Sequence, residues 1–108
     1  MRQCAVDEQF EYQFEWDPSK AQRNAREHKL TFDEAIEVFS DAAALSQYDT
    51  EHSNGEDRWI TLGMDQAGRL LVVCHTFQEI TKVRARVRIF SARKATRDER
   101  RCYEKHDL

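Results

Sequence analysis

The sequence predicts an α+β fold in which a small antiparallel sheet carries two N-terminal helices and one C-terminal helix. Two kinds of observation support this prediction. Apolar and polar residues alternate in residues 10–14 and 82–90, which is typical of strands with one buried face. Helix-capping residues precede three other segments, at Asp17, Thr31 and Thr96.

The N-terminal half contains one predicted strand and two predicted helices. The strand covers residues 10–14. The first helix runs from about Pro18 to His28, because Asp17 is a good N-cap and proline suits the first helical position. The second helix covers residues 31–40 and begins with a capping box of threonine and glutamate. Its apolar residues recur at the spacing of a core-facing stripe: Phe32, Ala35, Ile36 and Phe39.

The C-terminal half contains the remaining predicted strands. Residues 42–48 form a strand that a polar loop follows, and residues 58–64 and 69–76 form a hairpin joined by the sequence DQAG. Residues 82–90 form the last strand, with Val83, Ala85, Val87 and Ile89 on one face. A final helix begins near Thr96, where Glu99 completes a second capping box. No linker divides the chain, so we expect a single domain over residues 1–108.

Charge is distributed unevenly along the chain. The net charge of −3 combines residues 1–57, which carry 5 Lys/Arg and 14 Asp/Glu, with residues 80–108, which carry 10 Lys/Arg and 4 Asp/Glu. The small net charge therefore results from an acidic N-terminal half and a basic C-terminal segment that largely cancel. This asymmetry indicates a local anion-binding surface, which the overall composition alone would not suggest.

Several classes of protein are excluded. Cys4, Cys74 and Cys102 are odd in number and widely spaced, so we expect no disulfide framework and no metal site. No apolar run is long enough to span a membrane, and the first residues lack the apolar core of a signal peptide. No nucleotide-binding or hydrolase motif occurs. We therefore expect a cytoplasmic protein without a cofactor.

The strongest functional signal is a row of arginines on the last strand. Strand alternation places Arg84, Arg86 and Arg88 on one face, roughly 7 Å apart. Further cations follow the row: Arg93, Lys94, Arg97, Arg100 and Arg101. Arginine binds phosphate well because its planar fork donates two hydrogen bonds and stays charged. A single arginine is more often an ordinary solvated residue, but for the whole cluster we favour anion binding.

Other polar residues are weaker candidates. Lys20, Asn24 and His28 lie four residues apart along one stripe of the first helix, which is either a solvent-facing surface or a set of phosphate or base contacts. His75 ends the apolar strand, where it is equally well a general acid or base or an inert edge residue. Arg58 follows two acidic residues and either pairs with them or faces a ligand.

Three stretches carry a resemblance to a known family. They read FEWDPSKAQRNAREHKLTFDEAIEVFSD (14–41), EDRWITLG (56–63) and RIFSARKATRDERRCYE (88–104). Together they resemble the BrnT family of type II toxins, in the family's order and over nearly the whole chain. The sequence departs from the family pattern at Phe90, where isoleucine is more usual and where we expect only packing to change. It departs again in the longer stretch EITKVRAR before the last strand.

The resemblance implies a RelE-like fold and an RNA-cleaving activity. Such metal-independent ribonucleases use the 2′-hydroxyl group of RNA to attack the adjacent phosphate, so the protein must position the strand and stabilise charge. The resemblance assigns phosphate stabilisation to Arg88, Arg93 and Lys94, with Ser91 as a positioning hydroxyl. His28 or His75 is the candidate acid or base. Further RNA contacts are expected at these positions: Lys20, Asn24, Arg58, Arg84, Arg86 and Arg97.

The resemblance also implies partners. A BrnA-like antitoxin with a ribbon-helix-helix DNA-binding part would neutralise the toxin, and the complex would bind operator DNA. The alternative function is a non-catalytic module whose basic face binds nucleic acid or an acidic protein. Cleavage of an unstructured RNA in the presence of EDTA distinguishes the two.

Overall fold

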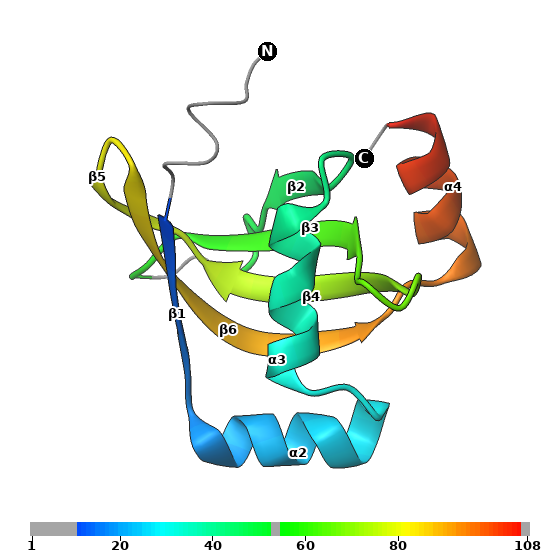
Figure 1. The fold of residues 1–108 in the computed structure, drawn as a ribbon, viewed down its shortest axis with the longest axis horizontal. Coiled ribbons are helices and arrows are strands. Elements are labelled where there is room, and N and C mark those ends of the chain that lie inside the picture. Colours follow the sequence, from blue (N-terminus) through cyan, green and yellow to red (C-terminus); the bar gives the residue numbers. More distant parts are fainter. Residues whose placement is uncertain (1–10, 53–54, 107–108) are drawn as a thin grey trace.

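A computed structural model describes residues 11–52 and 55–106 of the chain. The polypeptide forms a curved, six-stranded sheet with helices on both faces (Figure 1). The elements follow one another in this order: β1 (Glu11–Trp16), α2 (Pro18–His28), α3 (Phe32–Ala35), η1 (Ile36–Ser40), β2 (Leu45–Tyr48), β3 (Arg58–Met64), β4 (Leu70–Thr76), β5 (Gln78–Thr81), β6 (Arg84–Lys94) and α4 (Arg97–Lys105). The predicted α+β class is confirmed.

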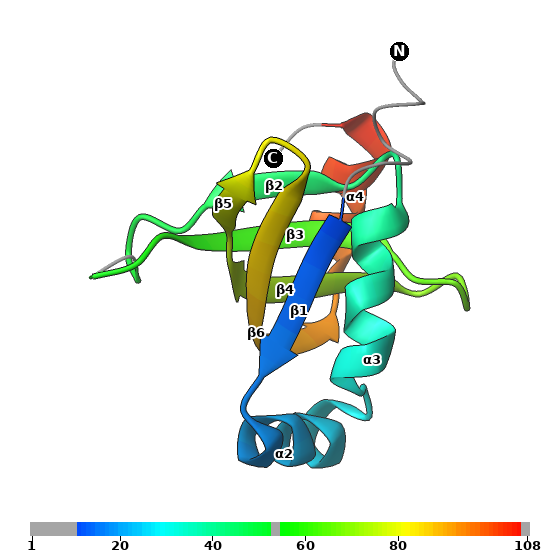
Figure 2. The same ribbon diagram turned by 60° about the vertical axis from the view of Figure 1, so that its left-hand side comes forward.

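Strand order explains how distant parts of the chain meet. The order across the sheet is β1-β6-β4-β3-β2, and β5 pairs with β6 alongside β4. All pairings are antiparallel except that of β1 with β6, which is parallel. The sheet is therefore mixed rather than purely antiparallel, because the first strand joins the last one at the sheet edge. Figure 2 shows β1 running beside β6.

The three predicted helix starts are confirmed. Asp17 accepts a hydrogen bond from the backbone of Ser19 and caps α2, with Pro18 in the first turn. Thr31 and Thr96 each form a reciprocal capping box with the glutamate three residues later. Satisfying these exposed backbone donors fixes each helix start locally, which is why the sequence was sufficient to locate them.

One face of the sheet packs against α2, α3 and η1. Leu71 and Val73 of β4 and Val87 and Ile89 of β6 are fully or almost fully buried there. The second predicted helix supplies Phe32 and Ala35 to this core, as its apolar stripe predicts. It is α-helical only to Ala35 and continues as the 3₁₀ helix η1. A Cβ atom on Gly63 would lie 2.9 Å from the Val38 Cβ, so glycine permits η1 to approach β3.

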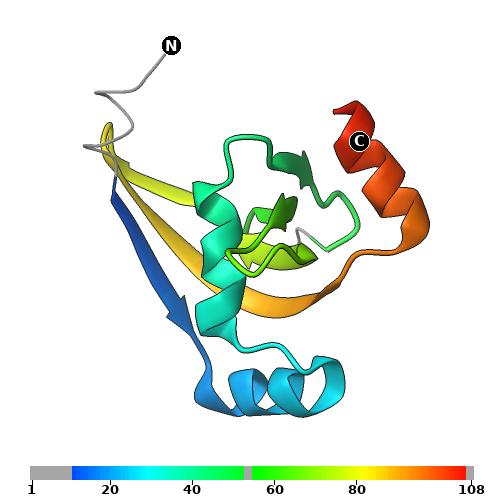
Figure 3. The ribbon, with the colours of Figure 1, turned by 45° about the vertical axis from the view of Figure 1, so that its right-hand side comes forward.

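The opposite face carries a smaller core under α4. Leu62, Leu70 and Val72 are buried on this face, and Cys102 and Tyr103 of α4 pack against them. Figure 3 shows α4 separated from α2 and α3 by the sheet. The face under α2 and α3 is called the inner face below, and the face that carries α4 is called the outer face. None of the helices in the described ranges has the length and apolarity needed to cross a bilayer.

Several predicted strand boundaries are wrong. The predicted strand 42–48 begins only at Leu45, because the Asp41 carboxylate binds the backbone of Ala43 and holds a turn. The predicted strand 82–90 runs instead from Arg84 to Lys94, and Val83 lies in the preceding turn with 43% of its surface exposed. β5 was not predicted. The first strand begins at Glu11, while Phe10 lies outside the described residues.

Candidate functional site

The arginine row lies on the outer face, as strand alternation predicts. Arg84, Arg86 and Arg88 are exposed, and the intervening Ala85 and Val87 are buried on the inner face. The parallel register places Glu11 beside Arg84, where the carboxylate and the guanidinium lie 3.0 Å apart. Acidic residues from the N-terminal half therefore lie along the row and offset part of its charge.

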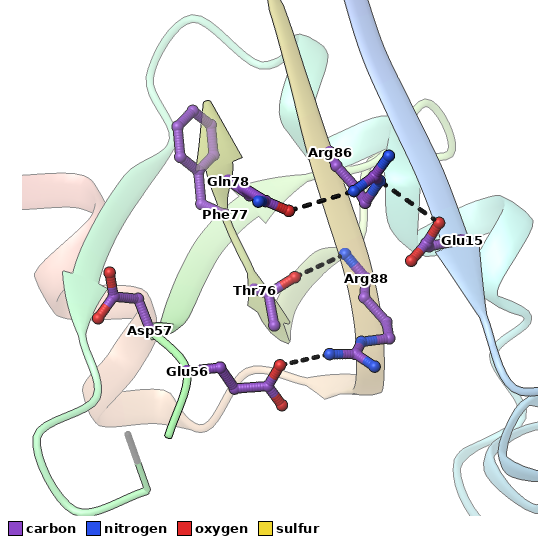
Figure 4. A pocket seen from close by; sticks show the side chains of 8 residues that line it. All are labelled: Glu15, Glu56, Asp57, Thr76, Phe77, Gln78, Arg86 and Arg88. Carbon is purple, nitrogen blue, oxygen red and sulfur yellow. Dashed lines mark hydrogen bonds and ion pairs between the residues drawn. The ribbon is translucent and has the colours of Figure 1, made fainter. Parts of the chain in front are cut away.

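Arg86 and Arg88 line a pocket of about 350 Å³ on the outer face (Figure 4). We call this the arginine pocket, and it is lined by eight residues: Glu15, Glu56, Asp57, Thr76, Phe77, Gln78, Arg86 and Arg88. It lies where the start of β3, the junction of β4 with β5, and β6 approach one another. The pocket therefore contains both positively charged guanidinium groups and negatively charged carboxylates.

Each arginine of the pocket is held by side chains from other strands or from the loop before β3. The Arg86 guanidinium donates to Gln78 Oε1 at 3.3 Å and lies 3.8 Å from the Glu15 carboxylate. Arg88 forms a close ion pair with Glu56, and its backbone N–H donates to Thr76 Oγ1 at 3.0 Å. The Arg88 side chain is still 44% exposed. These contacts orient the guanidinium groups and leave them accessible to an anion.

Phe90 extends the cationic site towards α2. The Arg58 guanidinium carbon lies 4.2 Å from the Phe90 ring centroid, and Lys20 Nζ lies 5.2 Å from it. The Arg88 guanidinium lies 5.5 Å from the same centroid. Aromatic faces attract cations through the ring quadrupole. The Phe90 ring therefore contacts three predicted site residues through a cation–π geometry that an isoleucine side chain does not provide.

A β-bulge at Phe90 gives the site its shape. His75 is paired with Ile89 and Cys74 with Ser91, so Phe90 is an extra residue on β6. The bulge shifts the alternation by one residue. Ser91 and Arg93 consequently lie on the outer face, opposite Cys74 and Val72, although strict alternation from Arg88 would turn them inward.

Arg58 pairs with Glu56, one of the two acidic residues that precede it and one of the two alternatives that the sequence left open. Their side chains lie 3.7 Å apart, and Glu56 also binds Arg88. Two arginines therefore share one carboxylate. Sequence reasoning missed Glu56 as a functional residue, and the only signal for it was its position two residues before Arg58.

Arg93 is part of a different arrangement. Its guanidinium donates two hydrogen bonds of 2.8 Å to the carboxylate of Glu99, the capping-box residue of α4. The hydrogen bonds from Arg93 are the main cause that lowers the pKa of Glu99 to about 2. Arg93 thus connects β6 with α4, and this contact occupies the nitrogens that a phosphate would use.

The other predicted residues of the C-terminal segment are dispersed. Lys94 ends β6 and Arg97 begins α4, and both are exposed. Ser91 is half-buried opposite Cys74. None of the three lines the arginine pocket. Their predicted roles in catalysis or RNA binding stay predictions.

The structure places His75 away from the arginine row. The ring is buried on the inner face, where Nε2 lies 2.7 Å from Thr61 Oγ1 and Nδ1 lies 2.8 Å from the Thr76 carbonyl oxygen. Burial lowers the pKa of His75. This position corrects the prediction that His75 serves as the acid or base at the arginines, because sheet alternation directs its side chain to the opposite face.

His28 and Lys20 occupy opposite ends of α2. His28 is the exposed last residue of the helix, and eight residues separate it from Lys20, or about 12 Å along the axis. Only the Lys20 end contacts Phe90. The proposed stripe therefore brings one of its members to the site and leaves His28 at a distance from it.

Asn24 is a structural residue, which corrects its prediction as an RNA contact. It is 5% exposed, its Nδ2 donates to the Leu30 carbonyl at 3.1 Å, and its Oδ1 accepts from the Ala92 backbone N–H at 3.1 Å. The side chain joins α2 to β6 and to the loop before α3. A buried amide that satisfies two backbone groups is costly to replace.

Comparison with known proteins identifies relatives of the chain. Residues 16–99 match the family described as "Ribonuclease toxin, BrnT, of type II toxin-antitoxin system". The fold is similar to the crystal structure of the Brucella abortus ribonuclease toxin BrnT, with a TM-score of 0.51 and 17% sequence identity. That likeness covers 82% of this chain and 99% of the Brucella chain. No curated protein sequence matches significantly.

Proposed function

The chain belongs to the BrnT family of ribonuclease toxins of type II toxin–antitoxin systems, and from that premise we propose that it cleaves RNA through metal-independent attack by the RNA's own 2′-hydroxyl group. The observation that carries the proposal is the arginine pocket. Arg86 and Arg88 face it together with the carboxylate of Glu56, and Arg58 lies beside them over the Phe90 ring.

The arginines supply charge stabilisation in the proposed reaction. A bond forms between the 2′ oxygen and phosphorus while the bond from phosphorus to the 5′ oxygen breaks. The products are a 2′,3′-cyclic phosphate and a 5′-hydroxyl group. Negative charge builds up on the non-bridging oxygens in the transition state, and guanidinium groups already oriented by neighbours stabilise it without further reorganisation.

Glu56 is the proposed general base. In the unbound protein its carboxylate pairs with Arg88 and Arg58. A phosphate that binds these arginines replaces the carboxylate as their partner and leaves it beside the scissile phosphate, free to accept the 2′-hydroxyl proton. A water molecule protonates the departing 5′ oxygen, and the hydroxide ion that this leaves takes the proton from Glu56, which restores the carboxylate. This assignment replaces the histidines that the sequence suggested.

Cleavage of an unstructured RNA by purified toxin in EDTA tests the proposal. We expect fragments that end in a 2′,3′-cyclic phosphate. Arg88→Ala should reduce kcat by about 10²–10³-fold, the typical cost of losing one transition-state donor. Arg101→Ala is the matched control, since Arg101 is an exposed arginine of α4 that pairs with Asp98.

Two outcomes would contradict the proposal. Cleavage that requires an added divalent cation would refute metal independence. RNA retardation in a gel without any cleavage would favour the non-catalytic binding module. Circular dichroism of each variant must match that of the wild type, so that a loss of activity is not a loss of fold.

The proposed antitoxin is a ribbon-helix-helix protein similar to BrnA, and the proposed complex binds operator DNA. Membership of a type II family supports an antitoxin protein as partner. The type of antitoxin rests on the family resemblance. Co-expression with the neighbouring reading frame should yield a stable complex that retards its own promoter DNA, whereas toxin alone should not. Because the substrate is RNA, we propose that the toxin acts in the cytoplasm.

A further inference from the structure

A second pocket, of about 250 Å³, opens on the inner face of the sheet. We call it the aromatic pocket, and it is lined by Tyr12, Phe39, Ser46, Trp59, His75 and Phe77. The rings come from β1, η1, β3, β4 and the residue that joins β4 to β5. Tyr12 and Phe77 are each 38% exposed, so apolar rings of this pocket face solvent.

The aromatic pocket adjoins the arginine pocket at Phe77, which lines both. The ladder between β3 and β4 ends at Arg58 and Thr76, and β5 then pairs with β6 and with no other described strand. The sheet therefore forks at Phe77, between the start of β3 and β5. Figure 4 shows the Phe77 ring directed away from Arg86 and Arg88. An RNA strand that is bound at the arginines and continues past Phe77 therefore reaches the inner face.

A chain of hydrogen bonds fixes which groups the aromatic pocket offers to a ligand. His75 Nδ1 lies 2.8 Å from the Thr76 carbonyl oxygen, which can only accept, so this nitrogen carries the proton. Burial lowers the pKa of His75 and keeps the ring neutral at neutral pH, so its Nε2 accepts from the Thr61 hydroxyl at 2.7 Å.

Ser46 is the end of this chain. Thr61 Oγ1 gives its only proton to His75, so it must accept a proton from Ser46 Oγ, which lies 2.8 Å away. The exposed Ser46 oxygen then presents lone pairs to the pocket. It is an acceptor, and it is matched by a ligand that carries an N–H group.

We propose that the aromatic pocket binds one nucleobase of the RNA whose adjacent phosphate occupies the arginine pocket, and that it favours bases with an exocyclic amino group over uracil. Single-stranded RNA is commonly recognised by stacking unpaired bases on aromatic side chains. Stacking on Phe77 and Trp59 supplies affinity for any base. The Ser46 acceptor adds preference, because adenine, cytosine and guanine have an exocyclic amino group at the edge of the ring, whereas the single ring N–H group of uracil lies between two carbonyl oxygens, which the Ser46 lone pairs repel.

The inference rests on the proposed function, but binding tests it without cleavage. Fluorescence anisotropy measures the Kd of a labelled 2′-O-methyl oligonucleotide, in which the attacking hydroxyl is blocked. We expect Phe77→Ala and Phe77→Leu to weaken binding about tenfold, since both remove one stacking surface. Phe77→Trp should retain wild-type affinity, which separates stacking from an effect on the fold.

Base preference is tested with 2′-O-methyl uridine oligonucleotides that contain a single adenosine or cytidine. The wild type should bind them about fivefold more tightly than the all-uridine oligonucleotide, as expected for one hydrogen bond. Ser46→Ala should abolish the difference. Gln47→Ala should preserve it, because Gln47 is an exposed neighbour on β2 that pairs with Ile60 and faces the other side.

The two proposals fail in different ways. Unchanged affinity in Phe77→Ala, or unchanged base preference in Ser46→Ala, overturns the base site even if the toxin cleaves RNA. Base-dependent binding that both variants reduce supports the base site, even if the corresponding unmethylated RNA is not cleaved. That second result would overturn the proposed ribonuclease chemistry alone.

Discussion

At the scale of single residues, the buried polar side chain of Asn24 stabilises the fold by joining α2 to β6 and to the loop before α3. Asn24→Ala would leave the backbone N–H of Ala92 and the carbonyl of Leu30 without their present partner. We expect the free energy of unfolding to fall by about 2–3 kcal/mol, the cost of leaving buried polar groups unsatisfied. Urea denaturation measures this. Arg23→Ala, at an exposed neighbouring position, should change stability by no more than about 0.5 kcal/mol.

Glu56 allows catalysis to be separated from binding at one residue. Glu56→Gln removes the proposed base and also a negative charge beside Arg88 and Arg58. We expect kcat to fall about 10²–10⁴-fold while RNA binds more tightly, because the arginines lose a competitor for phosphate. Single-turnover cleavage and equilibrium binding give the two quantities. Asp57→Asn, in the same pocket, should retain kcat. An equal loss of kcat in both variants would show that Glu56 is not the general base.

At the scale of elements, the pair of Arg93 and Glu99 attaches α4 to β6. The hydrogen bonds from Arg93 lower the pKa of Glu99 from 4.5 to about 2. A carboxyl group with a lower pKa in the folded state stabilises the protein above its unfolded pKa. This contribution is lost as the pH falls from about 4.5 to about 2. Solvent screening of the partly exposed pair limits it to about 1–2 kcal/mol.

Urea denaturation of the wild type and Glu99→Gln across this pH range tests the contribution. The wild type should be more stable at pH 6, and the difference should disappear towards pH 2. In an Arg93→Ala background, Glu99→Gln should no longer produce a pH-dependent difference. A difference that persists in that background would assign the effect to the capping box, which Glu99 also forms with Thr96.

At the scale of the whole molecule, the acidic and basic halves of the chain meet on one sheet. Glu11 and Glu15 lie beside arginines of the row, so the fold neutralises part of the charge itself. We still expect an acidic or apolar segment of the antitoxin to cover the surface of Arg84, Arg86, Arg88 and Arg93. Long-range attraction would then make the association rate fall as ionic strength rises.

Stopped-flow mixing of toxin and antitoxin at several salt concentrations measures this dependence. The double variant Arg84→Gln/Arg86→Gln should flatten it. The double variant Arg100→Gln/Arg101→Gln removes the same charge from α4 and should leave it unchanged. An association rate that does not vary with salt would locate the antitoxin interface on another face.

The predictions from sequence succeeded where a feature depends on near neighbours in the chain. The three helix starts were predicted because a cap involves residues within one turn. The arginine row was predicted because alternation is a property of one strand. The end of β6 was missed because the bulge at Phe90 depends on pairing with β4.

The sequence by itself determined the fold class, the family and the outward row of arginines, because these features depend on local patterns and on motifs in a fixed order. Only the tertiary structure decided that Asn24 and His75 are buried, that Glu56 meets Arg88 across 32 positions of sequence, and that two pockets adjoin at Phe77. Such contacts depend on which strands pair and which face each side chain takes. Pairing of β1 with β6 joins residues more than 70 positions apart, and its stability comes from burying a shared core, which no short segment specifies.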